Sequence, residues 1–233
     1  IPLDNPYVPA EILAATSKDI KWDRRMAEVG NVTTDNERET VRTWAGLQGT
    51  MLDDNWDWDI SAGFGQFQQK QTRYNELNTI NVKKALDAEY AADGTTIQCA
   101  DADARAEGCA PLNIFGINSI SAEAADYIRA NPTITTDIEQ VNVLGYVAGD
   151  LFDLPAGAVS TVFGAEYRKD SQSVKTNDEQ QWGGVTFNVV PTFTGDIDVA
   201  EMFAEAALPL LRDVVGAEHL TLEISGRVAD YSI

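Results

Sequence analysis

Residues 92–113 read ADGTTIQCADADARAEGCAPLN and hold the chain's only two cysteines, Cys99 and Cys109. Acidic residues lie close to them in the sequence: Asp93, Asp101, Asp103 and Glu107. Thiolates and carboxylates this near one another suit three kinds of chemistry: metal binding, redox exchange, or a disulfide that closes a loop. The residue types alone leave these three possibilities open.

Two metal-binding patterns can be tested directly on the residues. Asp101 and Asp103 occupy the first and third positions of a possible calcium loop, but Arg105 and Ala106 stand at its fifth and sixth positions, so the EF-hand pattern fails. The single histidine, His219, cannot supply a two-histidine zinc site, and no GxSxG accompanies it as a nucleophile. We predict no metal ion, no cofactor and no enzymatic activity, and we interpret His219 as a strand residue near a turn.

The net charge of the chain limits the kinds of partner that it is expected to bind. There are 37 acidic and 17 basic residues among 233, a formal net charge of −20. Such a surface repels phosphate backbones, so nucleic-acid binding is not expected. No apolar run reaches the roughly 18 to 20 residues of a spanning helix, and the first residues lack both an initiator Met and a signal-peptide pattern. We read the chain as a mature or excised segment.

Long stretches of alternating residues predict the elements around these groups. Residues 40–51 and 56–70 alternate with period two on either side of Asp53-Asp54-Asn55, which predicts a hairpin with a tight turn. Similar turns are predicted near residues 155 and 214, and Pro209 argues against a helix before the last of them. The alternation predicts six strands of about 12 to 16 residues.

The strands are joined at their other ends by long polar connections, Thr72–Thr133 and Ser171–Asp196. The first connection should contain a helix over residues 76–93, closed by Gly94, and a second helix that begins after Ser121 as N-cap. The fold class is therefore all-β: an antiparallel transmembrane β-barrel segment of about six long strands, with short helices in a long external loop. A soluble β-sandwich with a helical insertion is the alternative.

Aromatic residues near the predicted strand ends fit the girdles that such barrels place at the membrane interfaces. They are Trp56, Trp58, Phe152, Tyr167, Phe203 and Tyr231.

An ordered series of phrases resembles the β-barrel of TonB-dependent receptors, the outer-membrane active transporters of Gram-negative bacteria. The phrases, in chain order, are NPYVPAEI, WAGLQGTMLDDNWDWDISAGFGQ, CADADARAEGCAPLNIFGINSISAEAADYI, DLFDLPAGAVSTVFGAEYRKD, VAEMFAEAALPLL and LEISGRVADYS. The resemblance covers nearly all of residues 1–233, which would form part of the receptor's β-barrel domain. A plug domain, a TonB-contacting box and a terminal aromatic strand are not found in it.

The resemblance implies energised import of a scarce, bulky solute such as siderophore-bound iron, cobalamin or an oligosaccharide. The implied partners are the rest of the barrel and its plug, TonB–ExbB–ExbD acting through that plug, and outer-membrane lipid and lipopolysaccharide. A small-molecule or glycan ligand would meet the external loops, where Trp182, Asp101 and Asp103 are the candidate contacts. In such a loop Cys99 and Cys109 are expected to form a disulfide, because two sulfurs without histidine suit zinc poorly and a C-x9-C spacing is not that of thiol exchange.

Two other classes of function compete with the transporter segment. One is a secreted, acidic β-rich module that binds calcium or glycans. The other is a hydrolase whose paired carboxylates act as general acid and base. Strands near six residues long, packed as two sheets, would favour the secreted module over the barrel.

Overall fold

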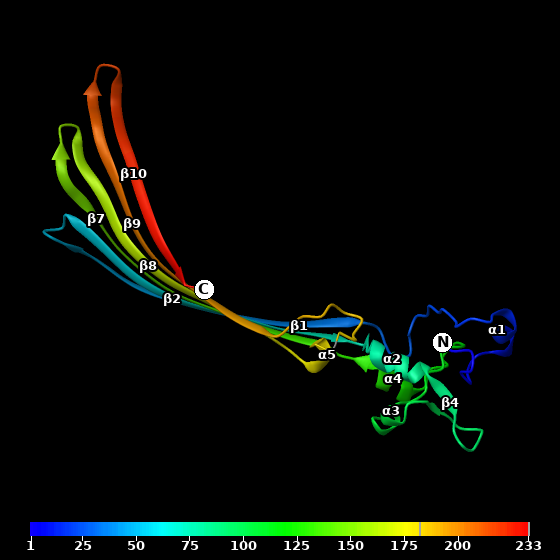
Figure 1. The fold of residues 1–233 in the computed structure, drawn as a ribbon. Helices are drawn as coiled ribbons and strands as arrows, with labels where there is room; N and C mark the ends of the chain where they lie inside the picture. The colour runs from blue at the N-terminus through cyan, green and yellow to red at the C-terminus, as the bar shows by residue number, and fades with distance from the viewer. Residues whose placement is uncertain (182, 233) are drawn as a thin grey trace. The chain divides into compact units, whose positions relative to one another are not determined.

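A computed structural model describes residues 1–181 and 183–232 of the chain (Figure 1). Its long strands are β1 (Thr33–Met51), β2 (Trp56–Tyr74), β7 (Thr133–Leu154), β8 (Gly157–Thr176), β9 (Phe193–Val214) and β10 (Ala217–Ser232). Short strands are β3 (Glu76–Leu77), β4 (Ala88–Tyr90), β5 (Ile97–Cys99) and β6 (Arg129–Ala130). The helices are α1 (Ala10–Ala15), α2 (Thr79–Leu86), α3 (Ala102–Ala106), α4 (Ala122–Ile128) and α5 (Asp178–Gln181).

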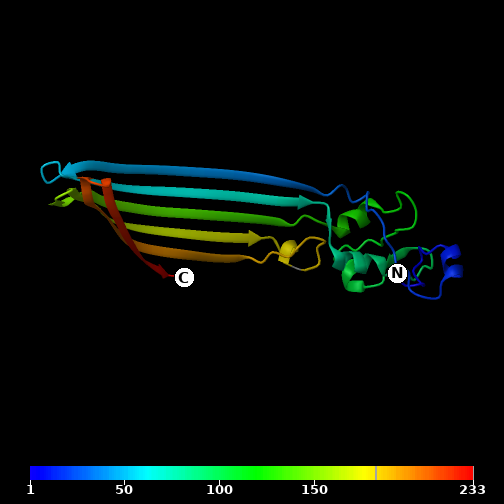
Figure 2. The same cartoon turned by 90° about the horizontal axis from the view of Figure 1, so that it is seen from above.

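The long strands form one six-stranded sheet in the order β1-β2-β7-β8-β9-β10 (Figure 2). The pairing is antiparallel: β8 pairs with β9 through partners such as Phe163 and Ala204, and β9 pairs with β10 with a bulge between Leu220 and Thr221. The predicted all-β, antiparallel architecture is therefore present. In the part of the chain that the structure describes, the sheet is open, with β1 and β10 at its two edges.

The three predicted tight turns are confirmed at residues 52–55, 155–156 and 215–216. The first turn holds Leu52, Asp53 and Asp54 in the left-handed region, with φ of 55°, 58° and 63°. Aspartate tolerates this conformation better than most residues because its short side chain can hydrogen-bond locally. Gly216, with φ of 96°, has the same function in the last turn.

The strands are longer than the sequence predicts. They run for 16 to 22 residues instead of 12 to 16, and β1 begins at Thr33, not Thr40. The added residues of β1 are TTDNERE (33–39), which carry no apolar alternation. Hydrophobic alternation does not predict such polar strand ends, because a strand with polar residues on both faces has no alternation of apolar and polar residues.

The chain divides into two compact units, which we describe separately. Unit 1 comprises residues 1–37, 69–135 and 175–192; unit 2 comprises residues 38–68, 136–174 and 193–233. Unit 1 contains the small helices around a hydrophobic core formed by buried side chains of α2, α4 and the segment between them. Its largest fully buried side chains include Leu112 and Ile128. Unit 2 contains the greater part of the six-stranded sheet.

The helices of unit 1 differ from the prediction in one case and agree with it in another. The helix expected over residues 76–93 is shorter: α2 ends at Leu86, and the chain continues into the β4–β5 hairpin, whose turn contains Gly94. Asn78 caps α2 by accepting the N–H groups of Ile80 and Asn81. Ser121 caps α4 as predicted, by accepting the N–H of Ala124.

None of the helices within the described residues combines the length and apolar character needed to cross a membrane.

Candidate functional site

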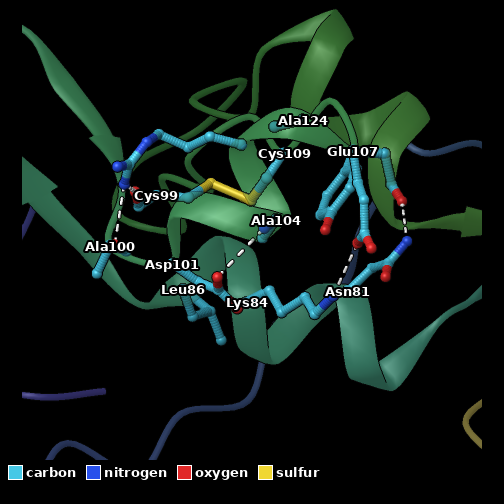
Figure 3. Close-up of a disulfide and its surroundings, with 12 residues drawn as sticks. Asn81, Lys84, Leu86, Cys99, Ala100, Asp101, Ala104, Glu107, Cys109 and Ala124 are labelled. Atoms are coloured by element: carbon cyan, nitrogen blue, oxygen red, sulfur yellow. Dashed lines mark hydrogen bonds and ion pairs between the residues drawn. A yellow bond between two sulfur atoms is a disulfide. The ribbon is translucent and has the colours of Figure 1, made fainter.

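The two cysteines lie together in unit 1 (Figure 3). Cys99 ends β5 and is fully buried, and Cys109 follows α3. Their sulfur atoms are 2.05 Å apart, at disulfide bonding distance, with Cα atoms 6.3 Å apart. Closing this loop restricts the unfolded chain and would stabilise the fold by roughly 3 kcal/mol on the loop-entropy account.

Polar contacts hold the closed loop in place. Arg105 donates from Nη1 to the carbonyl oxygens of Cys99 and Ala100, at 2.5 and 2.9 Å. The Lys84 ammonium lies 2.9 Å from the Glu107 carboxylate, which links α2 to the end of α3 (Figure 3). Contacts within unit 1 therefore hold the backbone around the two cysteines.

The two acidic candidate residues beside the cysteines have different surroundings. Asp101 caps α3 by accepting the N–H groups of Asp103 and Ala104, at 2.9 and 3.2 Å. These hydrogen bonds, Ala104 first, lower the pKa of Asp101. Asp103 is exposed in the first turn of α3, where a carboxylate interacts favourably with the helix dipole. Both carboxylates therefore have a local role in the helix.

Neither a metal-binding cluster nor the remaining candidate ligand contact, Trp182, lies within the described residues. No group of three or more His, Cys, Asp or Glu side chains is placed to hold a metal ion within residues 1–181 and 183–232. Trp182, the other candidate contact, lies outside the described residues. The prediction that Trp182, Asp101 and Asp103 contact a ligand therefore stays a prediction.

The sheet of unit 2 has one apolar face, to which every long strand contributes. Trp56 of β2 stacks on Phe163 of β8, with ring centroids 6.4 Å apart. A Cβ on Gly149 of β7 would lie 2.5 Å from the Trp56 ring, so Gly149 belongs to this same face. Likewise, a Cβ on Gly49 of β1 would lie 2.9 Å from the Trp58 ring.

Since side chains alternate along a strand, these contacts and the registers of β8–β9 and β9–β10 define the rest of the apolar face. Its large members are Val41, Leu47, Trp56, Trp58, Ile60, Phe64, Val141, Val143, Val147, Phe163, Tyr167, Met202, Leu208, Leu222, Ile224 and Val228. Most of them are exposed: Leu47 by 69%, Met202 by 72% and Val228 by 77%. Soluble monomers rarely expose a continuous apolar surface of this extent.

The opposite face, here called the polar face, carries charged side chains at the positions that alternate with these apolar residues. Its ionisable members include Arg42, Asp57, Asp59, Glu166, Arg168, Asp170, Glu201, Glu205, Glu223 and Arg227. Arg227 pairs with Glu201 at 2.8 Å and lies over the Phe203 ring, 5.3 Å from its centroid. Over the extent of the apolar residues named above, the charged side chains therefore lie on the polar face, which also carries the Phe203 ring.

On β8 and β9 the apolar face is followed by polar contacts, in the direction of the C-terminal end of β8 and the N-terminal end of β9. The Tyr167 hydroxyl donates to the Asp198 carboxylate at 2.5 Å. One residue pair further, Lys169 lies 3.4 Å from Asp196. The Tyr167 ring therefore lies on the apolar face, and its hydroxyl lies at the border of that face, where it has a polar partner.

The aromatic residues of the predicted girdle do not all lie on one face of the sheet. Trp56, Trp58 and Tyr167 lie on the apolar face, but Phe203 and Tyr231 lie on the polar face. Phe203 pairs with Gly164 and Arg227, and Tyr231 pairs with Val199, which gives both the opposite parity. Nearness to a strand end was the basis of the prediction, and it does not specify the face.

Comparison with known proteins adds no relative: neither a family model, nor a curated protein, nor a solved structure matches the chain.

Proposed function

We propose that this chain is a segment of an outer-membrane active transporter similar to the TonB-dependent receptors, and that its sheet forms part of the transporter's membrane wall. One observation carries the proposal: all six long strands contribute apolar side chains to one exposed face, and β1, β2, β8, β9 and β10 place charged side chains on the other. This is the alternation of a barrel strand between lipid and a polar lumen.

The height of the apolar face supports a bilayer as its environment. On β1, β2 and β7 it extends over residues 41–49, 56–64 and 141–149. Each range is about nine residues, close to the roughly 9 to 11 that a tilted strand needs to cross the hydrocarbon core. The strands continue past this band as polar β-structure, which fits strands that project beyond the membrane.

The connections support the same arrangement. Each of the turns β1–β2, β7–β8 and β9–β10 takes four residues or fewer, whereas β2–β7 and β8–β9 are joined through folded segments of unit 1. Short turns at one end and long loops at the other are typical of outer-membrane barrels. In this proposal unit 1 is the external part, in an oxidising environment that suits the cysteine pair.

The proposed transporter would use this chain for binding and passage, with no chemical step. Solute captured by the external part would pass along the polar face once the plug, driven by TonB–ExbB–ExbD, opens the lumen. Acidic external residues would also bridge to lipopolysaccharide through divalent cations. The free edges of β1 and β10 would pair with the remaining strands of the receptor, because lipid does not tolerate unpaired backbone groups.

The secreted calcium- or glycan-binding module is the less favoured function. Its expected architecture has strands near six residues packed as two sheets, whereas the long strands run for 16 to 22 residues in a single sheet.

A pair of neighbouring substitutions tests the membrane proposal. Ala165 is exposed on the apolar face, and Glu166 follows it on the polar face. Ala165→Arg should destabilise the sheet in lipid by about 2–4 kcal/mol, because it puts a charge into hydrocarbon. Glu166→Arg, the matched control, should change the free energy of unfolding by much less.

The measurement is urea unfolding of the full chain in lipid vesicles, followed by tryptophan fluorescence. On a water-exposed surface both arginines would be tolerated, since such changes usually stay within about 0.5 kcal/mol. Equal, small effects of Ala165→Arg and Glu166→Arg would therefore contradict the proposal.

A further inference from the structure

The segment that precedes the first long strand differs in charge from the rest of the chain. Residues 18–25, KDIKWDRR, contain four basic and two acidic residues, in a chain whose net charge is −20. A local excess of positive charge on an acidic protein draws anions to that place.

This segment borders a hollow of about 580 Å³ in unit 1. The volume is within the range of small-molecule sites, roughly 300–1,000 Å³. One wall is the segment from Ile20 to Glu28, and the other is the segment from Ile114 to Asn118; Ile12 of α1 also contributes. Both apolar and cationic side chains line it.

The two walls are fastened together by Arg24. Its Nη1 donates to the carbonyl oxygen of Asn113 at 3.3 Å and to the Ser119 hydroxyl at 2.9 Å, and its Nη2 pairs with Glu28. Glu28 also accepts the N–H of Ile120 at 3.5 Å. Arg24 and Glu28 thus neutralise each other and fix the hollow before any ligand arrives, which lowers the ordering cost of binding.

Two other cationic side chains line the hollow without an ion-pair partner among the described residues. Lys21 and Arg25 are exposed, and neither makes an ion pair with another of the described residues. Asp23 is the remaining acidic residue of the lining, so the unpaired side chains carry a net positive charge. Trp22 is 36% exposed and Ile117 is 93% exposed, which leaves apolar surface beside the cations.

We propose that this hollow binds a small carboxylate that carries a flat apolar ring, with Arg25 and Lys21 holding the carboxylate and Trp22 contacting the ring. Arginine forms a two-pronged hydrogen bond with a carboxylate, and an indole face packs well against a planar ring. All lining residues belong to unit 1, so this inference is independent of whether the sheet of unit 2 lies in a membrane.

The test uses the full chain in detergent micelles and isothermal titration calorimetry, with empty micelles as the blank. The probes are 1-naphthoate, its neutral analogue 1-naphthamide, and acetate. We expect saturable binding of 1-naphthoate, binding of 1-naphthamide that is about tenfold weaker, and no measurable binding of acetate.

Two charge-removing variants separate this site from general charge effects. Arg25→Gln should weaken 1-naphthoate binding about tenfold and leave 1-naphthamide unchanged. Lys83→Gln removes an equally exposed cation on α2, also in unit 1, and should bind both probes as the unaltered chain does.

Three results would overturn the inference: no saturable binding, equal affinity for the naphthoate and the naphthamide, or equal losses in Arg25→Gln and Lys83→Gln. None of them bears on the membrane proposal, which the Ala165 and Glu166 variants test separately.

Discussion

The Asp93 carboxylate accepts three hydrogen bonds in the turn between β4 and β5. Its Oδ1 accepts the N–H groups of Thr95 and Thr96, both at 2.8 Å, and its Oδ2 accepts the Thr96 hydroxyl at 2.5 Å. These hydrogen bonds, the Thr96 hydroxyl first, lower the pKa of Asp93 from 3.8 to about 2. Gly94, with φ of 71°, lets the chain reverse beside it.

A pH titration tests this arrangement. Because the pKa is lowered in the folded turn, the charged form stabilises it above pH 3.8, and this contribution is lost as the pH falls from 3.8 through about 2. The side-chain carboxyl carbon of Asp93 should titrate in NMR with a midpoint near 2.

Thr96→Val removes the hydroxyl that contributes most and should move this midpoint upward toward 3.8. An unchanged midpoint in Thr96→Val would show that the hydroxyl is not the cause.

At the scale of the elements, a small residue on one strand allows large rings on its neighbours. Gly149 of β7 lies beneath the Trp56 ring, which reaches toward Phe163 of β8. A Cβ at Gly149 would lie 2.5 Å from that ring and 2.7 Å from the Asn55 carbonyl oxygen, closer than real Cβ atoms approach. The packing of β2, β7 and β8 near the first turn thus requires that residue 149 be a glycine, which has no side chain.

Gly149→Ala should destabilise the sheet by about 1–3 kcal/mol, because either the Trp56 ring or the backbone must shift. Gly195→Ala, in β9, is the matched control: no atom lies within 4 Å of its added Cβ. There alanine should be neutral or slightly stabilising, since it restricts the unfolded chain more than glycine does.

Urea unfolding of both variants in micelles measures the difference. Equal effects at the two positions would mean that Trp56 does not pack over Gly149.

At the scale of the whole molecule, the sequence predicts the order of strands and turns well and the faces less well. Alternation from Val41 onward, together with Asp53-Asp54-Asn55, identifies the first hairpin, since local pattern and turn chemistry agree there. The alternation of residues 40–51 and 56–70 agrees with the structure, in which a Cβ on Gly49 would meet the Trp58 ring and Trp56 stacks on Phe163.

What the sequence does not reveal depends on contacts between distant segments. Helix α3 has five residues, too few for a periodic pattern, and only Asp101 as a cap signals it. The parity of Phe203 follows from its pairing with Arg227, which is a long-range register. The hollow beside Arg25 needs residues 20–28 and 114–118 together, and no local pattern joins two such segments.

The most direct test of the membrane proposal is to find what surrounds each face. Cys99 and Cys109 are paired with each other, so a single cysteine introduced into β8 can carry a nitroxide label. Labels would be placed singly at residues 162, 163, 165, 166 and 167 of the full chain in lipid vesicles; Gly164 is left unaltered because a Cβ there would lie 2.2 Å from the Phe203 ring. Electron paramagnetic resonance then measures collisions with oxygen, which concentrates in lipid, and with a water-soluble nickel complex.

We predict that collision rates differ by face: oxygen dominates at Phe163, Ala165 and Tyr167, and the nickel complex dominates at Val162 and Glu166. Rates that favour the nickel complex at all five positions would place both faces in water and contradict the account.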